Sequence, residues 1–149
     1  MTALRAILID ATARQIREVE IDDHDHGSSD MRRLIGCDAF CMAARFDNGD
    51  ILFVDDAGLI DDVENLFSLE GANQALYAGN GLVVGSDGPE TAAAQTPLAF
   101  FEGKVSWSKR DERCGDVAEI LSRAGQVTSF NSYEDFRRQF RPRPPIKTT

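Results

Sequence analysis

The fold of this chain is decided by residues 50–88, which read DILFVDDAGLIDDVENLFSLEGANQALYAGNGLVVGSDG. Two apolar runs, Ile51–Val54 and Gly81–Gly85, are separated by acidic turns and a short polar stretch. Short apolar runs bounded by glycine and aspartate indicate β-strands joined by turns. Neither run carries a chemical group that an enzyme would need at its centre, so the stretch predicts a scaffold.

The flanking sequence contains further strand patterns. Residues 6–9 and 15–21 are rich in β-branched side chains, and Asp10 between them suits the first position of a turn, so they predict an opening hairpin. Residues 39–46 lead through Asn48-Gly49 into the first apolar run, and this dipeptide favours a two-residue type I′ turn because both positions take positive φ. Further strands are expected at residues 66–69, 81–85 and 105–107.

Helical patterns are fewer than strand patterns. A brief helix is expected up to Ile35, capped by Ser28 or Ser29 and ended by Gly36. Apolar residues at helical spacing predict a second helix over 117–124 that Gly125 ends. The other predicted elements are a mobile loop over 86–97 and a last helix that begins at Ser132 and carries Tyr133, Phe136 and Phe140 on one side.

Size and composition set the class of fold. A chain of 149 residues is near the commonest domain size, and no linker or repeat divides it, so we predict one domain over residues 1–149. The patterns predict an α+β fold with an antiparallel or mixed sheet of about six strands and two or three helices packed on it. Residues 141–149 are expected to form an extended, basic, proline-rich tail. No apolar run is long enough for a membrane span and no secretory signal is recognisable, so we expect a cytoplasmic protein.

Charge is distributed unevenly along the chain. The formal net charge is -9, and residues 1–64 hold 15 acids and 6 bases, whereas residues 65–149 hold 10 of each. An acidic body disfavours direct nucleic-acid binding. The acidic half and the basic end can instead engage another protein or a second copy, which leaves a homodimer open. The candidate partner-binding residues are Asp55, Asp56, Asp61 and Asp62 in the acidic half and Arg137, Arg138, Arg141 and Arg143 at the basic end.

Both histidines of the chain lie in one polar segment. His24 and His26 flank Asp25, and imidazole with carboxylate suits a divalent metal such as zinc, manganese or nickel. No distant third ligand can be assigned, and such a loop is usually just solvated. A Ser-His or Cys-His mechanism would have to recruit one of these two side chains, so the sequence predicts no catalytic residue and no cofactor.

Two further patterns fail as binding sites. The glycines at 79 and 81 lead into a strand, whereas a dinucleotide-binding loop leads into a helix whose amino terminus faces the phosphates. Cys37 and Cys41 lack the spacing and the second pair of a zinc site. Together with Cys114 they fit reduced thiols better than a disulfide framework.

The strand and turn residues resemble a known family. The resemblance rests on residues 4–9, 18–20 and 52–59, on Asn73 and on residues 81–85. Over residues 4–88 the chain resembles the domain-of-unknown-function 3846 family of bacterial, plasmid and phage proteins. The resemblance implies a small cytoplasmic domain, with a mobile-element origin as one possibility. It implies no activity and no catalytic residue, and the residues after 97 depart from the family's pattern.

Three classes of function follow from the sequence. The leading hypothesis is a non-catalytic protein-binding or self-associating module, favoured by the charge asymmetry and the missing catalytic constellation. The second is an acidic mimic of nucleic acid that blocks a defence protein. The third is a small metal-dependent enzyme that uses the loop of His24 and His26.

Overall fold

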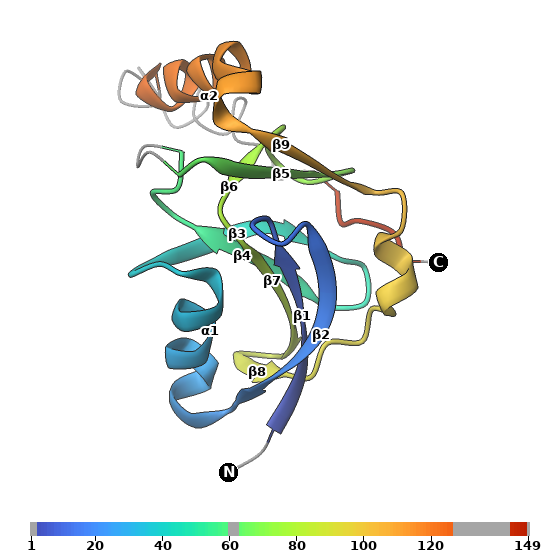
Figure 1. Ribbon diagram of the computed structural model, residues 1–149. Coiled ribbons are helices and arrows are strands. Elements are labelled where there is room, and N and C mark those ends of the chain that lie inside the picture. The colour runs from blue at the N-terminus through green and yellow to red at the C-terminus, as the bar shows by residue number, and fades with distance from the viewer. Residues whose placement is uncertain (1–2, 60–62, 127–143, 149) are drawn as a thin grey trace, which may run out of the picture.

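The computed structural model describes residues 3–59, 63–126 and 144–148 (Figure 1). The described strands are β1 (Ala3–Asp10), β2 (Gln15–Asp22), β3 (Phe40–Arg45), β4 (Ile51–Asp55), β5 (Asn65–Leu69), β6 (Tyr77–Ala78), β7 (Gly81–Asp87), β8 (Glu90–Ala92) and β9 (Val105–Lys109). The described helices are α1 (Ser28–Ile35), α2 (Cys114–Gln126) and three 3₁₀ helices, η1 (His24–Gly27), η2 (Leu98–Phe101) and η3 (Arg110–Arg113).

The strands form two antiparallel sheets. Within the described residues the larger sheet has six strands, in the order β2-β1-β7-β4-β3 with β8 paired to the end of β7. The smaller sheet has the order β6-β5-β9. The predicted α+β fold is confirmed, and the separate small sheet is an addition that the sequence patterns did not reveal.

The elements are stacked in four layers (Figure 1). Met31 and Ile35 of α1 pack on one face of the large sheet. The small sheet covers the opposite face, where Phe67 of β5 joins the main core cluster. Val117 of α2 packs with Leu66 on the outer face of the small sheet. Each sheet is therefore covered on both of its faces.

This layering explains the uninterrupted apolar runs of the central strands. In β1, Ile7 and Ile9 point into the core between the sheets, whereas Ala6 and Leu8 point towards α1, and all four are buried. A strand that is buried on both faces needs an apolar side chain at every position instead of an alternating pattern. The same reason applies to residues 82–84 of β7.

The predicted hairpin of β3 and β4 is confirmed, but its predicted type I′ turn is wrong. The Phe46 N–H donates to the Asp50 carbonyl at 2.9 Å, which closes a three-residue loop. Gly49 has a φ of 95°, but Asn48 is not among the residues with positive φ. A three-residue loop with glycine in the left-handed region is the next commonest hairpin connection. It directs the Asn48 side chain inward, where its Nδ2 donates to Thr96 Oγ1 at 3.0 Å.

Residues 86–97 are not the mobile loop that their composition predicts. β7 continues to Asp87, and β8 pairs back onto it with Gly85 opposite Ala92. The segment that follows is fixed by the buried carboxylate of Asp50. This carboxylate accepts hydrogen bonds from the Gln95 and Thr96 N–H groups and from the Thr96 hydroxyl, at distances of 2.6 to 3.1 Å.

The helices agree with the sequence in part. α1 ends at Gly36, which has the left-handed φ of 81° expected of a C-cap glycine, but its N-cap is Gly27 and no serine side chain caps it. α2 continues to Gln126, so Gly125 lies inside the helix instead of ending it. The predicted helix with Tyr133, Phe136 and Phe140 lies outside the described residues. No helix in the described part of the chain is long and apolar enough to cross a membrane.

Residues 144–148 run along the β3–β4 hairpin. Ile146 is buried and bridges Phe46 in parallel, with its N–H donating to the Arg45 carbonyl at 2.8 Å and its carbonyl accepting from the Asp47 N–H at 2.9 Å. The Thr148 hydroxyl donates to Asp47 Oδ1 at 2.6 Å. This described part of the predicted tail is therefore attached to the body of the domain.

Candidate functional site

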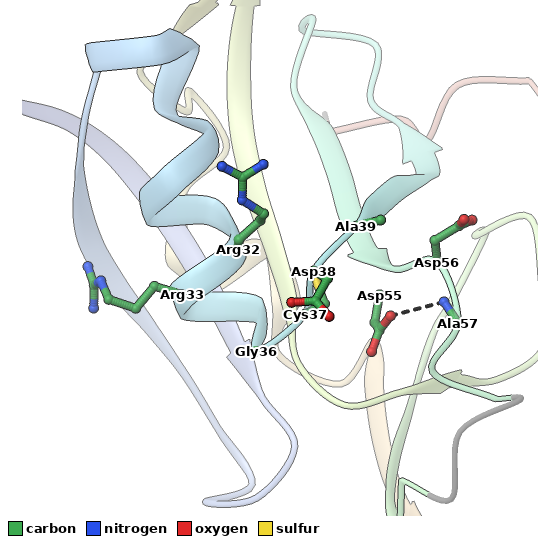
Figure 2. Close-up of a pocket in the computed structure, with 9 residues that line it drawn as sticks. All are labelled: Arg32, Arg33, Gly36, Cys37, Asp38, Ala39, Asp55, Asp56 and Ala57. Atoms are coloured by element: carbon green, nitrogen blue, oxygen red, sulfur yellow. Dashed lines mark hydrogen bonds between the residues drawn. The ribbon is translucent and has the colours of Figure 1, made fainter.

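A pocket lies where the carboxyl end of α1 meets the turn after β4 (Figure 2). Its volume is about 580 Å³. The residues that line it come from α1, from the link into β3 and from the end of β4; they are Arg32, Arg33, Gly36, Cys37, Asp38, Ala39, Asp55, Asp56 and Ala57.

Local hydrogen bonding brings these segments together. The Arg32 carbonyl accepts from the N–H groups of Gly36 and Cys37, at 2.8 and 3.0 Å, which ends α1 and turns the chain towards β3. Phe40 then pairs with Asp55, and the Asp56 N–H donates to the Ala39 carbonyl at 3.1 Å. The end of β4 is thereby held beside the end of α1.

The pocket collects charges of both signs. Figure 2 shows Arg32 and Arg33 on the helix side and Asp38, Asp55 and Asp56 on the strand side. We call these five residues the charged face. Arg33 has an exposed ion pair with Asp30 of its own helix at 3.4 Å, and the Asp55 carboxylate accepts from the Ala57 N–H at 2.9 Å. Among the described residues, no ion pair joins the two arginines to the three carboxylates of this face.

Two thiols border the charged face. Burial, followed by the nearby Asp55 carboxylate, raises the pKa of Cys37 to about 11. Burial, followed by a hydrogen bond with Asp56, raises the pKa of Cys41 to about 11 as well. Both thiols are therefore protonated near neutral pH, and a protonated thiol is a poor nucleophile and a poor metal ligand.

Alkylation should distinguish the cysteines. At pH 8 we expect iodoacetamide to label the exposed Cys114 well before Cys37 and Cys41, because a pKa of about 11 instead of 9.0 lowers the thiolate fraction about a hundredfold. Peptide mass spectrometry over time measures the three rates, and the urea-unfolded chain, in which all three should react alike, is the control. Equal rates in the folded protein would contradict the expected protonation.

The same two thiols make stability fall at high pH. In the unfolded chain they ionise near 9.0, whereas in the folded protein they keep their protons to about pH 11. The unfolded state therefore binds fewer protons between these values, and the free energy of unfolding decreases as the pH rises through this window.

The family comparison covers the segment that builds this site. The model of the family described as Domain of unknown function (DUF3846) matches residues 4–100. The chain belongs to the DUF3846 family. The match begins in β1 and ends in η2, so it includes α1, the large sheet and the charged face, and it extends past the residue 88 expected from the sequence. No curated protein and no solved structure matches the chain.

Only some of the predicted partner-binding residues of this DUF3846 protein lie in the described part of the chain. Asp55 and Asp56 lie on the charged face. The predicted residues Asp61, Asp62, Arg137, Arg138, Arg141 and Arg143 lie outside the described residues. The sequence patterns did not indicate Arg32, Arg33 and Asp38 as site residues. The adjacent arginines before a C-cap glycine were the available signal, but only the fold shows that they line one pocket with the end of β4.

The two histidines of the DUF3846 protein lie in η1, away from the charged face. His26 Nδ1 is 3.3 Å from Glu90 Oε2, and the His26 carbonyl accepts from the Thr91 hydroxyl at 2.7 Å. The Asp25 carboxylate accepts from the Ser29 hydroxyl at 2.6 Å. Across the described residues, no group of three or more His, Cys, Asp or Glu is arranged to hold a metal. Metal binding by His24 and His26 stays a prediction.

Proposed function

We propose that this DUF3846 protein is a non-catalytic protein-binding module and that the charged face is its contact surface. The observation that supports the proposal is that Arg32 and Arg33 share an open pocket with three carboxylates without pairing with them. Charges of both signs that are not joined to one another can pair with complementary charges of a partner.

The chemistry of the pocket also favours binding over catalysis. The thiols of Cys37, which lines the pocket, and of Cys41, which borders the charged face, are protonated at neutral pH, so neither is an activated nucleophile. Arginine is well suited to a partner's carboxylates because its guanidinium group donates two parallel hydrogen bonds. The expected partner surface is therefore a mixed one, with carboxylates opposite α1 and cations opposite the end of β4.

Charge reversal tests this proposal. The double variant Arg32→Glu/Arg33→Glu should reduce the amount of captured partner about tenfold or more when the tagged protein is used as bait in an extract of its own cells, because like charges repel. Quantitative mass spectrometry gives the amounts, and high salt should weaken the same interactions.

A matched control keeps the change in net charge the same. Arg14→Glu/Arg113→Glu alters two arginines away from the charged face. Arg113 has an ion pair with Asp116, three residues away, just as Arg33 has one with Asp30, so each double variant breaks one such pair. This control should capture the same proteins as the unaltered bait. If the Arg32→Glu/Arg33→Glu bait captures them equally well, the charged face is not the contact surface.

Other hypotheses from the sequence stay predictions. The acidic nucleic-acid mimic and the metal-dependent enzyme have no supporting contact among the described residues, and Arg32 and Arg33 interrupt the acidic surface that a mimic requires. A cytoplasmic location and a mobile-element origin also remain predictions.

A further inference from the structure

β3 is an edge strand of the large sheet, and only its second half is covered. In that half the Ala43 carbonyl accepts from the Asn73 N–H at 3.1 Å, and the Arg45 carbonyl accepts from the Ile146 N–H at 2.8 Å. No described segment pairs with the outer side of residues 40–42. The first half of β3 therefore offers backbone groups to a further strand.

The alternating direction of backbone groups along an antiparallel strand identifies which N–H and C=O groups of β3 are unpaired among the described residues. The Ala39 carbonyl accepts from the Asp56 N–H, so Ala39 faces β4. Successive residues of a strand direct their N–H and C=O groups to opposite sides, so Phe40 and Met42 direct theirs away from β4. The side chain of Cys41 lies on the face that packs against the small sheet, whereas Phe40 lies on the α1 face.

The two edges of the large sheet differ in character. At the other edge, β2 presents Arg17, Glu18 and Glu20, all exposed, and charged side chains protect an edge from pairing. The open half of β3 carries no charge, and its Met42 side chain is 48% exposed, one of two large apolar side chains so exposed among the described residues. The β3 edge is thus the one suited to pairing.

Charges of opposite sign flank the open part of β3. Asp38 precedes it and Arg45 ends the strand, and neither has an ion pair within the described part of the chain. Arg45 lies opposite Ile51 of β4, and Ile51 is on the same side of the sheet as Phe53 and Asp55 because side chains alternate along a strand. Phe53 packs with the α1 cluster, so Arg45 is on the α1 side of the sheet, as is Asp55 of the charged face. A strand that is negative at one end and positive at the other is complementary to itself in antiparallel orientation.

We propose that the open half of β3 pairs with β3 of a second copy of this chain, so that Arg45 of each copy meets the carboxylates of the other copy's charged face. In this arrangement Phe40 lies opposite Met42 of the second copy, and Cys41 lies opposite its own equivalent. The contact is isologous and joins the two large sheets through about four backbone hydrogen bonds. It rests on the proposed function and specifies the partner as a second copy.

The pairing is short, so a weak dimer is expected. Sedimentation velocity from about 1 µM to about 1 mM should show a change from one to two chains, with a Kd of about 10–100 µM. Met42→Lys introduces an exposed charge at the centre of the edge and should abolish the dimer without loss of folding, because the Met42 side chain is already exposed.

A charge swap tests the orientation of the two strands. Asp38→Arg alone and Arg45→Asp alone should each raise the Kd about tenfold, because each places like charges opposite one another. The double variant Asp38→Arg/Arg45→Asp should restore the dimer, because it exchanges both signs. Arg14→Asp, which makes the same charge change in the β1–β2 turn, is the control and should dimerise normally.

Cysteine cross-linking tests the register. Residues opposite one another at a position without mutual hydrogen bonds have Cα atoms about 4.5 Å apart, which is within disulfide reach. A variant that keeps Cys41 but carries Cys37→Ser and Cys114→Ser should form disulfide-linked dimers at alkaline pH when copper-phenanthroline with oxygen is the oxidant. The same variant with Met42→Lys added, which should not dimerise, is the control and should form few such cross-links.

The outcomes separate this inference from the proposed function. A dimer that persists in Met42→Lys and shows no cross-link through Cys41 overturns the β3 contact but leaves a self-associating protein. A chain that stays monomeric at every concentration overturns the second copy as partner. This holds even if the unaltered protein captures another protein from an extract and Met42→Lys does not. In both cases the Arg32→Glu/Arg33→Glu capture experiment decides the proposed function independently.

Discussion

Replacing Asp50 with alanine should lower the free energy of unfolding by about 3 kcal/mol. The Asp50 side chain is 0% exposed, and its carboxylate holds the Gln95 and Thr96 N–H groups and the Thr96 hydroxyl. Alanine would leave these donors without their acceptor, and a buried unsatisfied donor costs about 1–3 kcal/mol. Urea denaturation followed by circular dichroism measures the change.

Two further variants make the result interpretable. Asp50→Asn keeps the shape but places an amide NH₂ against a donor, so it should recover only part of the lost stability. Asp87→Ala removes an exposed carboxylate from the end of β7 and should stay within about 0.5 kcal/mol of the unaltered protein. If Asp50→Ala behaves like Asp87→Ala, the carboxylate does not hold residues 95 and 96 in place.

Gly85→Ala should be comparably destabilising, by about 3 kcal/mol, for a steric reason. A Cβ atom at Gly85 would overlap the Ala93 carbonyl oxygen, and this oxygen belongs to the backbone, so it cannot move as the tip of a side chain can. β8 would have to separate from β7, and the anchored segment after β8 would move with it. The midpoint of urea denaturation should therefore fall.

The same substitution at Gly115 is the matched control and should have the opposite sign. Gly115 lies in α2, has no positive φ, and a Cβ built there meets nothing within 4 Å. Alanine is a better helix former than glycine, so Gly115→Ala should stabilise the protein by up to about 1 kcal/mol. A Gly85→Ala variant as stable as Gly115→Ala would mean that β8 is not packed against Gly85 as described.

The sequence predicted those parts of the fold that local pattern controls. The apolar runs in β1 and β7 indicated strands because side chains buried on both faces leave an uninterrupted apolar pattern, and the run in β4 indicated a strand because it follows a glycine-bearing turn. Gly36 indicated the end of α1 because few other residues adopt the left-handed conformation found there.

Prediction from the sequence failed where a distant residue controls the local structure. Residues 86–97 have the composition of a loop, but Asp50 and Arg5, far away in the chain, hold the segment after β8 through its backbone. The turn at Asn48 is a second example of control by a distant residue. The Asn48 side chain donates a hydrogen bond to Thr96, and the loop that holds it is not the type I′ turn that the local sequence predicts.

For the candidate site, the sequence by itself determined the acidic turn at Asp55 and Asp56 and the class of fold that carries it. Only the tertiary structure brought Arg32 and Arg33 into one pocket with that turn and left the first half of β3 open at the edge of the sheet. The physical reason is that composition and periodicity report on neighbours along the chain, whereas a contact surface is set by strand order, which depends on pairings between segments far apart in the sequence.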